Sequence, residues 1–272
     1  MTHLQSIRLR SSSNDPLPRS FPFDLPFVGT LRDETLNLSS PVTIFVGENG
    51  SGKSTLLEAL ASATELPAVG HIDLSIDATL AHARVLADEL SLSWSGPRSR
   101  LGFFLRAEDF FGFARRMDTL RAEFEADVDR IRSNDALSDR ARAFALQAPT
   151  REIGELRRRY GEGVDARSHG EQFLELFAGQ IRGRGLYLLD EPEAPLSPHR
   201  QLSLISLIMH ATRHDAAQFI IATHSPLLMA IPGAAIFSFD DTGIQPAQWE
   251  SLEHVTLTRD FLNDPELFLR HL

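Results

Sequence analysis

A glycine-rich segment between an apolar run and a helical pattern constrains this chain more than any other feature. It reads Gly47-Glu48-Asn49-Gly50-Ser51-Gly52-Lys53-Ser54 and satisfies every fixed position of the pattern G-x-x-x-x-G-K-[ST]. The run 42–46 before it is rich in β-branched residues and predicts a buried strand, whereas apolar residues recur at helical spacing over 56–61. Pro67 bounds that helix. This order of strand, loop and helix indicates an α/β core.

The segment has the composition that phosphate binding requires. Glycine lets the backbone curl so that successive N–H groups point at phosphate oxygens, and the following helix presents its positive end to the anion. We expect Lys53 to reach the β- and γ-phosphates of ATP and the Ser54 hydroxyl to ligate Mg²⁺. The residues expected to contact the nucleotide here are Glu48, Asn49, Gly50, Ser51, Gly52, Lys53, Ser54 and Thr55.

Composition narrows the remaining classes. The chain has 272 residues, of which 42% are hydrophobic, enough for a sizeable core. Acidic residues outnumber basic ones by 37 to 27, which argues against a protein whose whole surface binds nucleic acid. A local basic groove remains possible. The absence of cysteine excludes disulfides, thiolate metal sites and cysteine nucleophiles, and it fits a cytoplasmic protein. We find neither a signal-peptide pattern nor an apolar run long enough to span a membrane.

Two further apolar runs end in polar residues that suit catalysis. Asp190 and Glu191 follow the run 186–189, and adjacent carboxylates are rare in buried strands. At the end of a parallel strand Asp190 would hold Mg²⁺ through water and Glu191 would polarise an attacking water. His224 follows the run 220–222 and would contact the γ-phosphate or that water. The plainer alternatives are a polar strand end for the acids and a structural role for His224. Glu191, His224 and Lys53 are the candidate catalytic residues.

The rest of the chain alternates strand and helix patterns. We expect a single domain over 1–272, with a core of 1–70 and 171–250, an inserted β and helical subdomain of about 71–170, and a tail over 251–272. The patterns predict strands over 4–9, 27–31, 36–38, 186–189, 218–222 and 235–239, antiparallel strands within 72–94, and helices over 107–160, 171–181, 199–214 and after Pro265. In the helix over 199–214 we expect Leu202, Ile205, Ile208 and Met209 to share the buried face.

Together these motifs resemble the ATP-binding-cassette (ABC) superfamily of ATPases. Ser168-His169-Gly170-Glu171 resembles the S-x-G-[EQ] form of its signature motif, and Ser168 stands 115 residues after Lys53 and 22 before Asp190. The resemblance implies an α/β P-loop NTPase fold with a mainly parallel core sheet, an antiparallel β portion and an inserted helical subdomain. It also implies a head-to-tail homodimer in which Ser168, Gly170 and Glu171 of one copy complete the ATP site of the other. The run 193–197 would be the D-loop at that interface, and His224 the switch histidine.

The closer resemblance is to soluble bacterial ATPases of the AAA type, which are related to chromosome-maintenance and double-strand-break-repair ATPases. It rests on the runs 190–194, 222–226 and 259–262. His169 departs from the usual glycine of the signature. The Q-loop glutamine is also missing, and Arg106 or Glu108 would take over its metal or coupling role, unless both are ordinary surface residues. For the adenine, one ring among Phe21, Phe23 and Phe27 could stack on the base, although core packing would explain these phenylalanines equally well.

Three functions fit these features. The main hypothesis is a soluble ATPase that hydrolyses ATP with Mg²⁺ as a homodimer and uses the closure of the dimer mechanically on DNA, in repair or genome maintenance. DNA or a nuclease would then be its partner. The alternative is the ATP-binding subunit of an ABC membrane transporter, which the missing Q-loop glutamine disfavours. The third is a nucleotide-dependent binding module, which Glu191 disfavours. The candidates for a basic DNA-binding surface are Arg98, Arg100, Arg115, Arg116, Arg157, Arg158, Arg159, Arg182 and Arg184.

Overall fold

The strand, loop and helix around the glycine-rich segment form as the sequence predicts. The computed structural model describes residues 3–10, 18–69, 80–98, 101–134, 136–160, 169–181 and 183–270. In it, β3 (Val42–Gly47) is buried along its whole length and α2 (Lys53–Thr64) follows the loop. The helix ends where Glu65 adopts a left-handed φ of +50° and Pro67 prevents a further turn.

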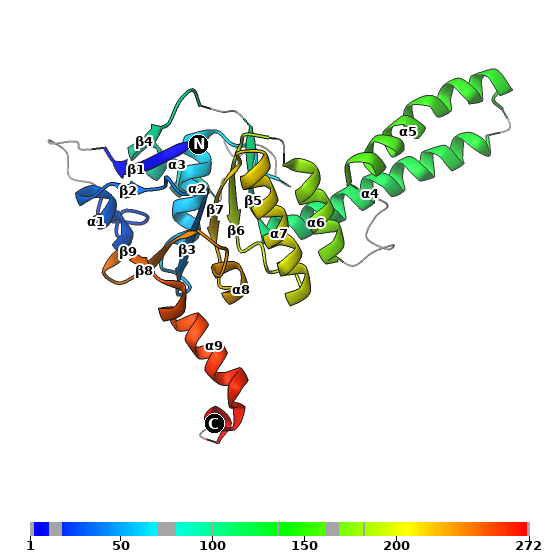
Figure 1. Ribbon diagram of the computed structural model, residues 1–272. Helices are drawn as coiled ribbons and strands as arrows, with labels where there is room; N and C mark the ends of the chain where they lie inside the picture. Colours follow the sequence, from blue (N-terminus) through cyan, green and yellow to red (C-terminus); the bar gives the residue numbers. More distant parts are fainter. Residues whose placement is uncertain are drawn as a thin grey trace.

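β3 lies inside a six-stranded sheet with the order β5-β6-β7-β3-β8-β9 (Figure 1). The other strands are β5 (Gly102–Arg106), β6 (Leu186–Asp190), β7 (Gln218–Ala222), β8 (Ala235–Asp240) and β9 (Gly243–Ala247). In this sheet β5, β6, β7, β3 and β8 run parallel to one another, and the edge strand β9 is antiparallel to β8. The carboxyl ends of β3, β6 and β7 therefore meet at one edge of the sheet, where open α/β sheets bind their ligands. This mainly parallel sheet confirms the predicted fold class.

Helices cover both faces of this sheet because its strands alternate their apolar side chains between two cores. Phe45, Leu188 and Ile220 belong to the core beneath α2, whereas Ile44 and Ile221 belong to the core on the opposite face. The elements beside the first core include α1 (Pro26–Asp33) and α3 (Ala81–Glu89). Those beside the second are α6 (His169–Gln180), α7 (Pro198–His214), α8 (Pro226–Met229) and α9 (Glu253–Asn263). Both faces are thus closed, and the site edge stays accessible.

A smaller antiparallel sheet borders the first core. It consists of β2 (Leu36–Asn37), β1 (Leu4–Leu9) and β4 (Leu90–Trp94), in that order. The strand predicted over 27–31 is wrong, because this segment forms α1 and buries Phe27, Val28 and Leu31 on one helical face. Pro26 stands at the start of that helix, where its fixed φ is favourable. Of the antiparallel strands predicted within 72–94, β4 forms and pairs with β1, but the prediction is wrong for 81–89, which form the helix α3. Residues 70–79 lie outside the described residues.

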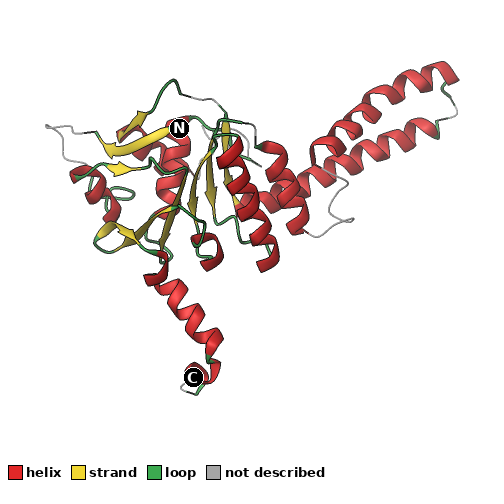
Figure 2. Ribbon diagram, viewed as in Figure 1, coloured by secondary structure: helices red, strands yellow, loops and turns green. Residues whose placement is uncertain are grey.

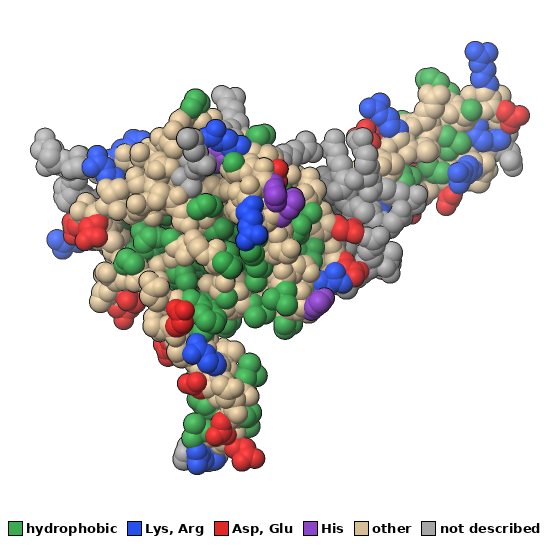
Figure 3. All heavy atoms as spheres, viewed as in Figure 1, with side chains coloured by type: hydrophobic (Ala, Val, Ile, Leu, Met, Phe, Trp, Pro, Cys, Tyr) green, Lys and Arg blue, Asp and Glu red, His purple; other side chains and the backbone are tan. Residues whose placement is uncertain are grey.

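Two helical arms extend from the body. α4 (Ala107–Arg132) and α5 (Asp139–Tyr160) form an antiparallel hairpin beside β5, as the charged helical pattern predicts (Figures 1 and 2). α9 continues into α10 (Pro265–Leu269) and forms a C-terminal arm. On the face drawn in Figure 3, basic and acidic side chains are interspersed along both arms. Among the described residues, no helix combines the length and the apolar character that crossing a membrane requires.

The buried face of α7 differs from the expected one. Leu204, Ile208 and Ala211 are buried, whereas Leu202 is 53% exposed. Ile208 lies on the predicted face and Ile205 packs partly buried against the same core, whereas Leu202 does not. The helix carries apolar side chains on two adjacent stripes, and its docking against the sheet selects one of them, which helical spacing alone does not specify.

Candidate nucleotide-binding site

The glycine-rich loop turns sharply at two positions where only glycine fits, because any side chain there would collide with neighbouring atoms. Gly52, at the start of α2, has a φ of +98°, and a Cβ there would stand 2.6 Å from the ring of Phe27. Gly47, at the end of β3, has a φ of +144°, and a Cβ there would collide with the carbonyl oxygen of Phe239. Phe27 and Phe239 are both buried, so the core beneath the loop enforces its shape.

Lys53 folds back over the loop that precedes it. Its Nζ donates hydrogen bonds of 2.8 Å to the carbonyl oxygens of Gly47 and Glu48 and lies 3.4 Å from the Ser51 hydroxyl. The residue is only 5% exposed. Burial lowers the pKa of Lys53, and the negative charges of Glu191 and Asp190 oppose that shift. A fixed ammonium group at the mouth of the loop suits the binding of phosphate oxygens.

Ser54 and Asp190, the two expected metal ligands, lie in contact across the site. The Ser54 hydroxyl donates a hydrogen bond of 3.0 Å to Oδ1 of Asp190, although the two residues are 136 positions apart. Burial raises the pKa of Asp190 to about 7, partly offset by the bond from Ser54. This donor set fits Mg²⁺, which is usually held by one or two protein oxygens together with phosphates and water.

Glu191 and His224 lie side by side at the ends of β6 and β7. His224 Nε2 is 3.8 Å from Oε1 of Glu191, and the Glu191 side chain is 49% exposed. The backbone of Glu191 has a φ of +49° and its N–H donates to the carbonyl of Ala222 at 2.9 Å. A left-handed φ is unfavourable for glutamate and recurs at functional sites. Burial and the charge of Lys53 lower the pKa of His224.

Glu193 organises the turn that carries His224, a role that the motifs do not reveal. Its Oε1 accepts hydrogen bonds from the Thr223 hydroxyl at 2.7 Å and from the backbone N–H groups of His224 at 2.7 Å and Ser225 at 3.1 Å. Burial raises the pKa of Glu193, and these hydrogen bonds oppose the shift. The sequence marks Glu193 as part of the run 190–194 and as the beginning of the expected D-loop, and neither indicates this role.

The part of the signature motif that the structure describes lies at the start of α6. Ser168 is outside the described residues. Gly170 is buried, and a Cβ there would be 3.2 Å from the carbonyl oxygen of Pro195 in the expected D-loop. Glu171 forms an ion pair with Arg200 at the start of α7. Gly170 and Glu171 do not line the cavity around Ser54 and Asp190, an arrangement compatible with their expected role toward a second copy of the chain.

A cavity of about 450 Å³ joins the predicted metal ligands to Arg106. It is lined by Ser54, Glu58, Arg106, Ala107, Asp190, Glu191 and Ala194. Arg106 ends β5 in register with Asp190, and its Nη1 lies 3.4 Å from Oε1 of Glu58 on α2. Glu58 also contacts His82 at 3.1 Å. Sequence reasoning singled out Arg106 but missed Glu58, since a helical glutamate carries no motif. The side chain of Glu108 is outside the described part.

The phenylalanines considered for the adenine have different environments. Phe23 and Phe27 are buried in the core, at 8% and 1% exposure. Phe21 is 52% exposed and its ring lies 5.0 Å from that of His82. Of these three, Phe21 alone presents a ring to solvent, so core packing accounts for the other two.

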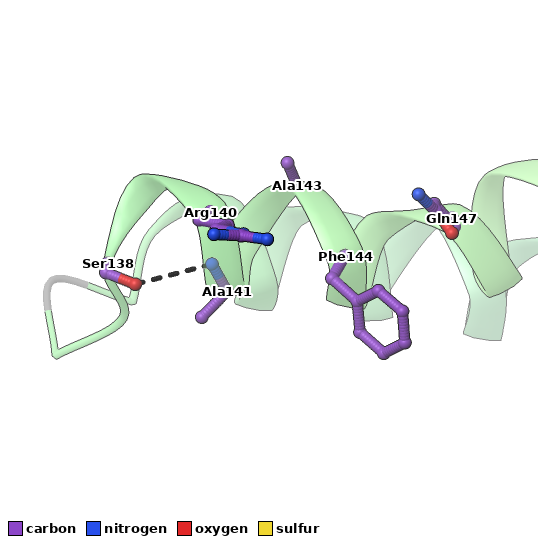
Figure 4. A pocket seen from close by; sticks show the side chains of 6 residues that line it. All are labelled: Ser138, Arg140, Ala141, Ala143, Phe144 and Gln147. Atoms are coloured by element: carbon purple, nitrogen blue, oxygen red, sulfur yellow. Dashed lines mark hydrogen bonds between the residues drawn. The ribbon is translucent and has the colours of Figure 1, made fainter.

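A second hollow, of about 560 Å³, lies on α5 near the turn of the hairpin (Figure 4). Ser138 caps the helix there by accepting a hydrogen bond of 3.4 Å from the Ala141 N–H, and Phe144 is 76% exposed. The lining also includes Arg140, Ala143 and Gln147. None of the motif residues contributes to this hollow, whereas Ser54, Asp190 and Glu191 line the first cavity.

The fold and this site define the chain as a P-loop ATPase with an ABC-like nucleotide-binding fold. Two family models match parts of it. One, described as "AAA domain", matches residues 20–65. The other, described as "AAA domain, putative AbiEii toxin, Type IV TA system", matches residues 165–230. The two segments contain the glycine-rich loop and the motifs from the signature to the turn after β7.

Individual relatives differ in their roles. The chain is 29% identical over 206 residues to the thiamine import ATP-binding protein ThiQ of Chelativorans sp. (strain BNC1), covering 75% of this chain and 74% of the relative. Among solved structures, the dimeric bacterial ABC transporter cassette MJ0796 is 16% identical, covering 93% of this chain and all of the cassette, with a TM-score of 0.45. The SMC head domain of Thermotoga maritima is 15% identical, covering 91% of this chain and all of the domain, also with a TM-score of 0.45. At these scores neither structural likeness bears on function.

Proposed function

We propose that the chain hydrolyses ATP with Mg²⁺ as a head-to-tail homodimer. The observation that carries this proposal is the Ser54–Asp190 hydrogen bond, which joins the phosphate-binding loop to the acidic strand end. Bound Mg²⁺ would be held by Ser54 and Asp190 and would neutralise the phosphate charge. Glu191 orients and deprotonates the attacking water, while Lys53 and His224 donate hydrogen bonds to the terminal phosphate. Ser168, Gly170 and Glu171 of the second copy complete the site.

Two variants test the dimer. Lys53→Ala should abolish nucleotide binding, measured by calorimetry. Glu191→Gln should keep ATP binding, lose about 100-fold or more in kcat because the general base is gone, and accumulate as a dimer in size-exclusion chromatography with ATP. Glu250→Gln, on the exposed helical turn η3 (Trp249–Ser251), is the matched control and should behave as the wild type. A Glu191→Gln protein that binds ATP but elutes only as a monomer would overturn the dimer.

For the work that hydrolysis drives, the thiamine-import relative supports a transporter subunit better than an action on DNA. In that role a membrane permease would be the partner. The comparisons give no specific support to DNA repair. The chain has no glutamine at the usual Q-loop distance, and we propose that Arg106, which lines the nucleotide cavity, takes its coupling role. Purification of the tagged chain from a native membrane extract should recover a permease if this assignment is correct.

Action on DNA is the second candidate, favoured by the motif resemblance to the soluble AAA-type branch. Of the arginines considered for a basic surface, Arg98 lies 3.7 Å from Glu65 and 5.9 Å from the centre of the Trp94 ring, so it already packs on the body. Binding to duplex DNA that weakens steeply with salt would support this candidate. The absence of binding at low salt, with and without ATP, would remove it.

A further inference from the structure

The C-terminal arm begins directly against the turn that carries His224. Leu252 and Val255, at the start of α9, are buried in the core on the α7 side of the sheet. Trp249 Nε1 donates a hydrogen bond of 3.2 Å to the carbonyl oxygen of Pro226. These contacts fix the first turn of α9 beside residues 223–226.

One side chain of that first turn reaches the proposed catalytic histidine. His254 Nε2 lies 3.3 Å from Nδ1 of His224, and the two ring centroids are 5.3 Å apart. A hydrogen bond between two imidazole nitrogens needs one donor and one acceptor, so the pair must adopt one of two tautomeric arrangements. The choice decides whether the other nitrogen of His224, Nε2, carries a hydrogen.

The surroundings of His224 Nε2 discriminate between the two arrangements. This nitrogen is buried, makes no hydrogen bond within the described structure, and lies 3.8 Å from Oε1 of Glu191. A bare Nε2 lone pair would face the glutamate carboxylate and be repelled by it. An Nε2–H would be attracted to that carboxylate and could donate to a phosphate or water oxygen.

We infer that His254 is a positioning residue that sets the tautomer of His224. The Nε2–H of His254 donates to Nδ1 of His224. This bond keeps the hydrogen of His224 on its own Nε2, directed at the reacting phosphate. The use of that hydrogen in catalysis rests on the proposed function, whereas the tautomer itself does not. The inference also connects the C-terminal arm to the site, since any movement of the first turn of α9 would move His254.

Nitrogen-15 NMR of the full-length protein labelled at histidine tests the tautomer directly. We expect the His224 signals, assigned with His224→Gln, to indicate the Nε2–H form at a pH where the ring is neutral. His254→Leu should shift the His224 signals toward a tautomer mixture, whereas His254→Gln, whose amide can still donate, should preserve the Nε2–H form. His210→Leu, on α7, is the control for the loss of a histidine. Unchanged His224 signals in His254→Leu would overturn the inference.

Steady-state kinetics provide an independent readout. His254→Leu should lower kcat about 10-fold with little change in KM, because one neutral hydrogen bond that orients a catalytic group is lost. His254→Gln should restore most of the activity. If the wild type does not hydrolyse ATP, the proposed function fails while the NMR result still decides the tautomer. If the wild type is active and His254→Leu equals it in kcat, the inference fails alone.

Discussion

At the scale of single residues, the site keeps its acid groups at an energetic cost. Asp190 is only 8% exposed, and burial raises its pKa to about 7. In an unfolded chain an aspartate has a pKa near 3.9. Between these values the folded state holds a proton that the unfolded state releases, so the cost that Asp190 adds is absent below about pH 4 and grows as the pH rises to about 7.

Asp190→Asn should therefore stabilise the protein at neutral pH when nucleotide and metal are absent. Each unit of pKa shift corresponds to about 1.4 kcal/mol, so a gain of a few kcal/mol and a Tm increase of several degrees are expected at pH 8. The difference from wild type should shrink as the pH is lowered toward 4. Calorimetry in a chelating buffer measures it, with Asp241→Asn on the exposed turn after β8 as control. A lower Tm for Asp190→Asn at pH 8 would contradict the prediction.

Among single residues of the site, some could be predicted from the sequence and others could not. Ser54 and Asp190 were paired from sequence because each follows an apolar run at a fixed offset, and parallel strands bring such offsets together. Glu58 and His254 were missed. Glu58 lies on α2 beyond the motif, and His254 lies on α9, which carries none. The contact of each with the site depends on how its helix packs, which is a property of the tertiary structure.

At the scale of elements, one buried glutamine joins the two sheets. The Gln218 Oε1 accepts hydrogen bonds from the N–H groups of His3 at 3.0 Å and Leu4 at 2.8 Å. Its Nε2 donates to the carbonyl oxygens of Leu4 and Leu38, both at 2.8 Å. The residue is fully buried at the start of β7, so the amide serves backbone groups of β1 and of the segment after β2 that water cannot reach.

Gln218→Leu should destabilise the protein by about 3 kcal/mol or more, because it leaves several buried backbone groups without partners at about 1 to 3 kcal/mol each. Gln218→Glu should also destabilise it, since a carboxylate lacks the two N–H donors. Urea unfolding measures both, and Gln245→Leu on β9 is the exposed control. A Gln218→Leu protein as stable as the wild type would show that these bonds contribute nothing net.

Sequence patterns predicted elements well where burial on both sides left no choice. The strands β3, β6 and β7 are buried along their whole length, are mostly apolar and lie in the centre of the sheet. The patterns were wrong for α1 and for Leu202 on the expected buried face of α7. In such segments the partner surface selects the conformation or the face, and a local pattern does not contain that surface.

At the scale of the whole molecule, the core is continuous across the expected domain boundaries. β4 pairs with β1 and β5 pairs with β6, although both strands fall in the block of about 71–170 that we expected to be inserted. Arg106 ends β5, directly precedes α4 and lines the cavity around Ser54 and Asp190, so it joins the α4–α5 hairpin to that cavity.

If each ATP site is shared between two copies of the chain, two different inactive variants should regain activity when they are mixed. Lys53→Ala removes the phosphate-binding half of a site and Ser168→Arg should block the signature half, so each variant alone should be inactive. Mixed dimers would contain one intact site. Random pairing should then restore up to about a quarter of the wild-type ATPase rate, measured by phosphate release from an equimolar mixture. A mixture no more active than its separate components would argue against sites that are shared and work independently.

The sequence by itself determined the α/β class, the phosphate-binding loop and the polar strand ends, because these depend on local composition and on the fixed geometry of parallel strands. Only the tertiary structure decided that Glu193 holds the turn of His224, that Glu58 faces Arg106 and that His254 reaches His224. These contacts join residues on different elements, whose relative placement is set by packing over the whole core. The loop thus identifies the chemistry of the site, and the fold supplies the groups that orient it.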